Sequence, residues 1–262
     1  MSLNFFQISK SLPFFTLMLL STFAYPKDVS LYFYGDDDSD EWHGAIQGLK
    51  EANAQGKFLK LQYALIAKKN LSEVKTYQPY AVISSLPPND LSQALRANPE
   101  IPFFNLRIMS NDAVTTCAPN LFHIRPHHSA LAAAETAWNL NNTMVAKAVL
   151  WHHTLKKYAA AQLNKRFEKN ANRKMNPASW AGWASVKLFS DVLARNVPTS
   201  ETTSLSFLKN NLAFDGQKGK NMFFNELNYL EQPLLFIYAE KIIGEVTTSR
   251  ILPIGSRTPP CK

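Results

Sequence analysis

The chain has 262 residues and a formal net charge of +8, with 28 lysines and arginines against 20 acids. Hydrophobic residues make up 46% of it, a share that excludes intrinsic disorder and predicts a buried core. A basic balance suits nucleic-acid binding, but the sequence carries no nucleic-acid-binding motif, so we predict no nucleic-acid partner.

Residues 1–24 have the composition of a secretory signal peptide. One cation, Lys10, precedes an apolar run from Leu12 to Leu20, and small residues follow in the sequence STFA. We therefore expect cleavage near Ala24 and a periplasmic protein. The apolar run is shorter than the roughly 20 residues that span a bilayer, so we expect no stable insertion into the membrane.

The mature chain is expected to begin with alternating strands and helices. Strands are predicted at 29–34, 61–66, 80–86, 101–106 and 121–124, and helices at 42–54, 87–97 and 129–141. Gly56 is expected to end the first helix and Asn89 to cap the second. Strands that are apolar throughout, between amphipathic helices, indicate a parallel sheet with helices on both faces.

The second half has a different pattern. A further strand is predicted at 145–153, followed by helices at 158–170 and 177–195, the latter with Asn176 as its cap and Pro177 at its first position. Residues 221–246 contain β-rich segments that predict a terminal hairpin, and the tail after Ile251 is expected to be extended.

The two cysteines of the chain are Cys117 and Cys261. An oxidising compartment favours one disulfide between them, and the chain-entropy model gives such a bridge about 4–5 kcal/mol of stabilisation. A pair of free thiols is the alternative.

An acidic loop, residues 36–41, lies between the first strand and the first helix. Its spacing fails the EF-hand pattern, because Glu41 stands at the sixth position and Gln47 at the twelfth. Acids before a helix can cap its amide groups, and the loop follows a strand end, where open α/β sheets bind ligands. An irregular site for a hard cation is the alternative.

Five histidines lie in the middle of the chain: His123, His127, His128, His152 and His153. Pro126 interrupts the helical spacing of His123 and His127, and no cysteine or carboxylate completes a zinc set, so we predict no metal. His127 and His128 precede a helix, where their donors suit an anion; ordinary capping is the alternative.

No motif indicates an enzyme or a cofactor. GxSxG, SxxK and GxGxxG are all absent, and Trp180 and Trp183 have the helical spacing of core residues.

A basic run between Lys147 and Lys174 holds eight cations and one acid, Glu168. It is typical of a solvated helix face, and contact with an acidic partner is the alternative.

Three stretches carry a family resemblance: residues 81–130, 158–189 and 214–224. They resemble type I periplasmic binding proteins, the branched-chain-amino-acid-binding class of ABC-transporter receptors, and within it the subgroup associated with PQQ-dependent alcohol dehydrogenases. Residues 161–187 carry the most specific motif. The subgroup pattern after the fourth strand is matched by Asn105, Asp112, Cys117, Phe122 and Pro126.

The resemblance implies an α/β fold with the Rossmann-like parallel sheet of the first lobe, added C-terminal helices and a β-hairpin. Residues 25–195 would form this lobe, and residues 196–262 a hairpin and extended tail packed on it. Family members hold a ligand between two closing lobes, but here the chain passes from residues 137–142 almost directly to a late motif. We therefore expect most of the second lobe to be missing.

The resemblance places the acidic loop on the cleft edge of the lobe. The residues expected to bind a solute are Asp36, Asp38, Ser84, Ser85, Asn105, His127 and His128. His127 stands where the family often has serine, which implies a different ligand. The predicted function is a non-enzymatic, solute-binding component of an ABC transporter, linked to PQQ-dependent alcohol oxidation and working with a permease. The alternative is an accessory protein that binds a periplasmic quinoprotein dehydrogenase or cytochrome.

Overall fold

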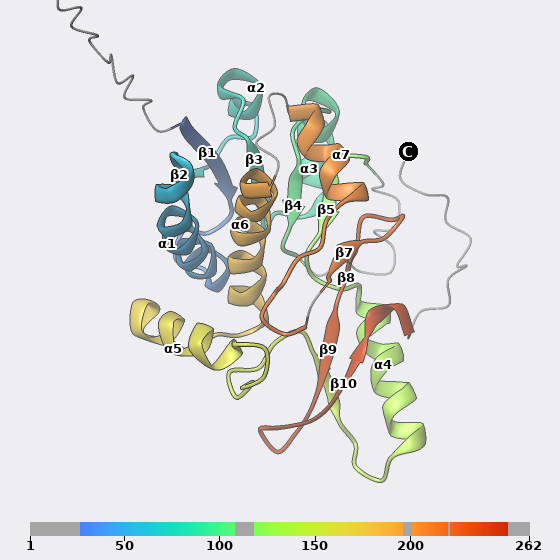
Figure 1. Cartoon of the computed structure of the whole chain (residues 1–262). Helices are drawn as coiled ribbons and strands as arrows, with labels where there is room; N and C mark the ends of the chain where they lie inside the picture. The colour runs from blue at the N-terminus through green and yellow to red at the C-terminus, as the bar shows by residue number, and fades with distance from the viewer. Residues whose placement is uncertain (1–26, 108–117, 196–200, 220, 251–262) are drawn as a thin grey trace, which may run out of the picture.

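The computed structural model describes residues 27–107, 118–195, 201–219 and 221–250 (Figure 1). The expected signal peptide, both cysteines of the expected disulfide, Asp112 and the tail after Ile251 lie outside the described residues.

The main sheet contains all five strands predicted in the first half. They are β1 (Lys27–Tyr34), β2 (Leu61–Lys68), β3 (Ala81–Ser84), β4 (Phe103–Asn105) and β5 (Leu121–His123). All neighbours are parallel, in the order β2-β1-β3-β4-β5. Because β1 lies between β2 and β3, the chain turns in opposite directions on either side of it, which creates a switch point at the carboxyl edge of the sheet.

Four helices accompany these strands: α1 (Asp40–Leu59), α2 (Glu73–Tyr77), α3 (Pro88–Ala97) and α4 (His128–Asn141). Two predicted boundaries were wrong. α1 continues through Gly56, which is buried so close to β2 that a Cβ there would lie 2.4 Å from the Leu61 carbonyl oxygen. Asn89 lies inside α3, whose N-cap is Pro87, because Pro88 already supplies the helical backbone angle.

A second sheet is built from residues on either side of the later helices. It joins β6 (Lys147–Val149), β9 (Pro233–Tyr238) and β10 (Lys241–Thr247) in the antiparallel order β10-β9-β6, which confirms the terminal hairpin. In Figure 1 this small sheet and α4 lie below the main sheet. The remaining elements are α5 (Ala160–Ala171), α6 (Pro177–Arg195), α7 (Glu201–Asn210), β7 (Phe223–Phe224), β8 (Leu230–Glu231) and the 3₁₀ turn η2 (Thr248–Arg250).

α6 begins as the sequence predicts and packs on α1. The Asn176 side chain accepts hydrogen bonds from the amides of Ala178 and Ser179 at 3.0 and 2.9 Å, which caps the helix. The two helix backbones touch, because a Cβ at Gly44 would lie 1.8 Å from the Ser179 carbonyl oxygen. A Cβ at Gly182 would likewise lie 1.9 Å from the Glu41 carbonyl oxygen, so each helix needs glycine at the crossing.

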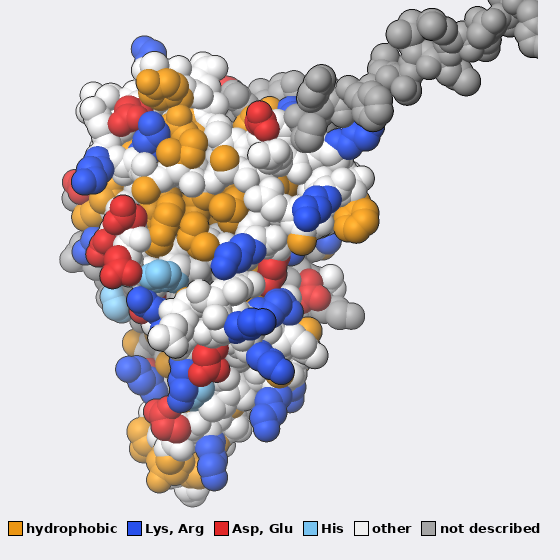
Figure 2. All heavy atoms as spheres, turned by 90° about the vertical axis from the view of Figure 1, so that its left-hand side faces the viewer, with side chains coloured by type: hydrophobic (Ala, Val, Ile, Leu, Met, Phe, Trp, Pro, Cys, Tyr) orange, Lys and Arg blue, Asp and Glu red, His pale blue; other side chains and the backbone are white. Residues whose placement is uncertain are grey.

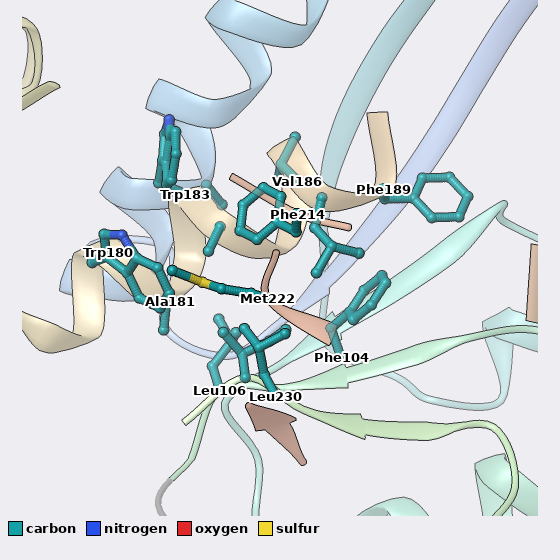
Figure 3. Close-up of a cluster of buried hydrophobic side chains, with 14 of the residues drawn as sticks. Phe104, Leu106, Trp180, Ala181, Trp183, Val186, Phe189, Phe214, Met222 and Leu230 are labelled. Atoms are coloured by element: carbon teal, nitrogen blue, oxygen red, sulfur yellow. The ribbon is translucent and has the colours of Figure 1, made fainter. Parts of the chain in front are cut away.

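The core lies between α6 and the main sheet (Figure 3). Trp180 and Trp183 are fully buried, as their spacing predicts, and the Trp180 indole donates a hydrogen bond to the Gly216 carbonyl at 3.0 Å. Figure 3 shows both indoles on α6, on the side of Met222 and Phe214. Phe104 of β4, the indoles of α6 and Leu230 of β8 lie in the same core as Phe214 and Met222.

One cation, Lys218, is fully buried in this core. Its ammonium donates to the carbonyl oxygens of Leu150 and Pro233 at 2.9 and 3.0 Å and lies 4.1 Å from the centre of a Trp180 ring. Burial lowers the pKa of Lys218 well below its usual value. The two carbonyls and the aromatic face satisfy the ammonium without a carboxylate.

The basic run is largely exposed, in agreement with a solvated face. Figure 2 shows lysines and arginines spread over one side of the molecule with acids between them. Arg166 forms an ion pair with Glu51 at 2.9 Å and Lys157 one with Glu245 at 3.8 Å. Exposed pairs of this kind contribute about 0–1 kcal/mol each to the free energy of unfolding.

Among the described residues, no helix has the length and hydropathy to cross a membrane.

Candidate functional site

The candidate site is the carboxyl edge of the main sheet. Ser84, Asn105 and His123 are the last residues of β3, β4 and β5, and strand register places them side by side. All three are buried. Ligands of open α/β sheets bind outside such an edge, so this polar row locates the region to examine.

Asn105 and His123 form a fixed pair. The Asn105 amide nitrogen lies 3.0 Å from His123 Nδ1, and because an amide nitrogen only donates, Nδ1 accepts. His123 is therefore the neutral tautomer with its proton on Nε2. Burial, with a smaller contribution from His127, lowers the pKa of His123 to about 3. The histidine thus stays uncharged at neutral pH.

Tyr229, from the segment between β7 and β8, covers this pair. Its ring stacks on His123 with centroids 4.2 Å apart, and the His123 amide donates to the Asn228 carbonyl at 2.8 Å. Burial raises the pKa of Tyr229 to about 12. The Tyr229 ring also meets His127 edge-on at 6.2 Å, so one tyrosine links β5 to the start of α4.

Two buried polar atoms beside this row have no hydrogen-bond partner among the described residues. They are Arg125 Nε, just after β5, and Gln232 Oε1. The Arg125 guanidinium contacts Glu41 at 3.5 Å and the Leu106 carbonyl at 3.4 Å through Nη1. Burial lowers the pKa of Arg125 and Glu41 opposes this, so the group stays charged. Gln232 donates to the Ile124 carbonyl at 2.7 Å, which places both open atoms beside the end of β5.

The acidic loop is tied to other parts of the protein. Asp38 lies 3.0 Å from His43 Nε2 and 3.7 Å from Arg173, and His43 followed by Arg173 lowers the pKa of Asp38. The Asn176 amide donates to Asp40 at 2.5 Å, which joins the loop to the start of α6. Ser39, and not an acid, caps α1 by accepting from the Trp42 amide at 3.1 Å.

The other predicted site residues are spread along the same edge. The Ser84 hydroxyl accepts from the Leu86 amide at 3.1 Å. Ser85 lies beside Gly35, the residue before the acidic loop, because a Cβ on Gly35 would be 2.1 Å from its hydroxyl. His127 caps α4 by accepting from the Ser129 amide at 3.2 Å, as the capping alternative predicts.

Asp36 and His128 are exposed. The edge therefore divides into two parts: Ser85 with the acidic loop, and Asn105 with His123, Tyr229 and His127.

Sequence reasoning missed Arg125, Gln232 and Tyr229. Only Arg125 had a visible signal, as a lone cation two residues after a strand. Within the described ranges, no three metal-ligating side chains gather at this edge.

No protein-family model matches the sequence, and no curated protein matches it. Solved structures match the fold. A periplasmic binding protein from Burkholderia mallei aligns with a TM-score of 0.68 at 8% identity, over 89% of this chain and 98% of that one. The chain has the fold of a periplasmic binding protein.

Two further matches carry ligand names in their descriptions. A leucine-, isoleucine-, valine-, threonine- and alanine-binding protein from Brucella ovis, in a closed conformation, gives a TM-score of 0.69 at 8% identity, over 86% of this chain and 97% of that one. A branched-chain amino acid transporter substrate-binding protein from Streptococcus pneumoniae, in complex with isoleucine, gives a TM-score of 0.61 at 11% identity. That alignment covers 84% of this chain and 99% of the other. These neighbours of the periplasmic-binding-protein fold are solute-binding proteins and not enzymes.

Proposed function

We propose that this chain is an exported, non-enzymatic solute-binding protein that binds a small amino acid or similar zwitterion at the carboxyl edge of the main sheet. The observation that carries the proposal is the buried Nε of the Arg125 guanidinium, which has no partner among the described residues, beside the similarly open Gln232 Oε1. Buried polar atoms without partners are costly, and a polar ligand would satisfy them. Support for the ligand class comes from neighbours that bind amino acids.

The charges at this edge suit a zwitterion. A carboxylate can pair with the Arg125 guanidinium, which presents its donors in a planar fork. A ligand ammonium can pair with Glu41, which lies 3.5 Å from Arg125, or with the exposed acids of the loop. Around these two contacts, the proposed lining remains Asp36, Asp38, Ser84, Ser85, Asn105, His127 and His128.

The small sheet is, in this proposal, what remains of the second lobe. It takes β6 from residues 25–195 and β9 and β10 from residues 196–262, so the C-terminal hairpin packs on the lobe across that division. The chain leaves the main sheet through α4, enters β6 and returns along α6 to pack on α1. A ligand covered by so small a lobe would lose part of the burial that closure gives a two-lobed receptor. We therefore expect modest affinity, delivery to an ABC permease, and a periplasmic location after removal of residues 1–24.

A second candidate is an accessory role, in which the chain binds a quinoprotein dehydrogenase or cytochrome of PQQ-dependent alcohol oxidation. One observation favours it: the exposed lysines of the basic run, including Lys156, Lys165 and Lys169, could contact an acidic protein. The link to PQQ-dependent enzymes rests on the sequence resemblance alone. Charge reversal at these lysines would weaken such a complex and leave solute binding unchanged.

Amino acids are expected to raise the melting temperature of the mature protein in a thermal-shift screen. At one hundred times the dissociation constant, binding adds about 2.7 kcal/mol to the free energy of unfolding. Arg125→Lys keeps a cation beside Glu41 but removes the guanidinium fork, so we expect the dissociation constant to rise at least tenfold by calorimetry. The double variant Asp36→Asn, His127→Gln should also weaken binding.

Asp90→Asn, an exposed acid in the first turn of α3, is the matched control and should bind like the wild type. A solute that binds Arg125→Lys and the wild type equally would contradict the assigned site. If no amino acid or other small solute shifts the melting temperature, the solute-binding proposal fails and the accessory role becomes the better explanation.

A further inference from the structure

Three potential metal ligands from distant parts of the chain meet beside the small sheet. His152 and His153 follow β6, and Glu240 lies in the turn between β9 and β10. One ligand atom from each of the three lies within 4.8 Å of the other two, and His152 Nε2 is 3.3 Å from Glu240 Oε2. The two imidazole centroids are 4.4 Å apart.

The histidine loop is held rigidly by one side chain of α5. The Asn164 amide nitrogen donates to the carbonyls of His153 and Leu155 at 2.9 and 3.2 Å, and its oxygen accepts from the Trp151 indole at 3.0 Å. Two of these hydrogen bonds hold the loop backbone, and the third joins Asn164 to the Trp151 side chain. The two imidazoles therefore start from a preorganised loop, which lowers the entropy cost of binding an ion.

The hairpin turn holds Glu240 over this loop. Ala239 and Glu240 have φ angles of 45° and 59°, the left-handed conformation that a two-residue type I′ turn requires. Farther along β10, Glu245 accepts a hydrogen bond from the Tyr158 hydroxyl at 3.1 Å, which ties the strand to the same loop region. Both sides of the cluster are thus anchored independently of any ion.

Thr154 can orient the first imidazole for coordination. Its hydroxyl oxygen lies 2.7 Å from His152 Nδ1. The Thr154 backbone amide lies 3.4 Å from the same nitrogen and donates to it when Nδ1 is unprotonated. In the other tautomer, Nδ1–H donates to the Thr154 hydroxyl and the lone pair of Nε2 faces Glu240. Metal-binding histidines usually have such a partner on the second ring nitrogen, and it fixes the tautomer.

We propose that His152, His153 and Glu240 bind a divalent transition-metal ion, with Zn²⁺ as the best fit. Two imidazoles and a carboxylate, with a fourth position left for water, are a common zinc ligand set. Zinc bond lengths place neighbouring ligand atoms of a tetrahedral site about 3.3 Å apart, and the His152–Glu240 distance of 3.3 Å has this value. Calcium and magnesium prefer oxygen ligands and should bind poorly. The sequence suggested no metal because Glu240 joins the histidines only in the folded chain.

Calorimetric titration of the full mature chain with Zn²⁺, after removal of any purification tag, tests the proposal. We expect one ion per chain and no comparable binding of Ca²⁺ or Mg²⁺. Glu240→Gln and His153→Gln should each weaken Zn²⁺ binding at least tenfold. Glu240 is 82% exposed in its side chain, so its variant should fold normally. Glu245→Gln removes the same charge from the same hairpin, but its amide oxygen can still accept from the Tyr158 hydroxyl, so this variant should keep the wild-type affinity.

Three further variants separate coordination from other effects. Thr154→Val should weaken Zn²⁺ binding about 10- to 100-fold, and Thr154→Ser should restore it, because the serine hydroxyl can replace that of threonine. Replacing both Cys117 and Cys261 with serine should leave the affinity unchanged. Failure of the wild type to bind Zn²⁺, or equal affinity in Glu240→Gln, His153→Gln and Glu245→Gln, would overturn the proposal.

Discussion

Replacing Gly182 with alanine is expected to lower the free energy of unfolding by about 3 kcal/mol, at the upper end of typical overpacking costs. The new Cβ would lie 1.9 Å from the Glu41 carbonyl oxygen and 2.8 Å from its carbon, which are backbone atoms of α1. Side-chain rotation cannot relieve this contact, so the two helices must separate. Gly44→Ala should have a similar effect, because its Cβ would lie 1.8 Å from the Ser179 carbonyl oxygen.

Urea denaturation of the three glycine variants along this crossing checks the explanation. Gly48→Ala is the internal control, since its Cβ would lie 2.8 Å from the Trp183 carbonyl oxygen and a smaller movement relieves it. We expect the denaturation midpoint to fall least for this variant. Helix propensity alone predicts the opposite sign, because alanine favours a helix over glycine by about 1 kcal/mol. A raised midpoint in Gly182→Ala would contradict the close crossing of α1 and α6.

Acid is expected to destabilise the protein through His123. Its pKa is about 3 in the folded chain and 6.5 in the unfolded chain, so above pH 6.5 both states are neutral and the full stability is present. Between pH 6.5 and 3 the unfolded state binds a proton that the folded state does not. The free energy of unfolding should therefore fall by about 1.4 kcal/mol for each unit of pH in this window.

Urea denaturation at pH 7.5 and pH 4.5 measures this loss, which should reach about 2–3 kcal/mol from this one residue. His123→Gln removes the titration and can still accept the hydrogen bond from Asn105, so its stability should depend less on pH. His128→Gln, at an exposed position, should follow the wild type. Equal pH dependence in the wild type and His123→Gln would mean that the pKa of His123 is the same in the folded and unfolded chains, and would contradict its burial as a neutral group.

Local patterns predicted most of the architecture. The five parallel strands are short apolar runs, and α6 has a cap, a first-turn proline and an apolar face within one continuous stretch. These patterns depend only on residues close together in the sequence, so the structures they predict are present in the folded chain. The errors arose where tertiary contact overrides local preference, as at Gly56, where the close approach of β2 requires a glycine inside the helix.

The candidate site was only partly predictable, because its geometry depends on contacts between distant residues. Strand ends identify Ser84 and Asn105 from the sequence, since parallel strands share one carboxyl edge. Nothing local reveals that Tyr229 stacks on His123, or that Glu240 joins the two histidines after β6. Lys218 is similar, because a lysine in the polar stretch DGQKGKN is expected to face solvent and not to lie beside Trp180. Such pairs become visible only when the chain order of the sheets is known.

Amide-resolved NMR titration of the mature protein with leucine, or with the strongest solute from the thermal-shift screen, tests the central claim most directly. The account predicts saturable chemical-shift changes that cluster at residues 35–41, 84–86, 105–107 and 123–129, all at the carboxyl edge of the main sheet. These changes should be lost in Arg125→Lys at the same solute concentration. Saturable chemical-shift changes confined to the lysines and arginines of α5 would contradict the proposed site. The absence of chemical-shift changes with every solute would also contradict it.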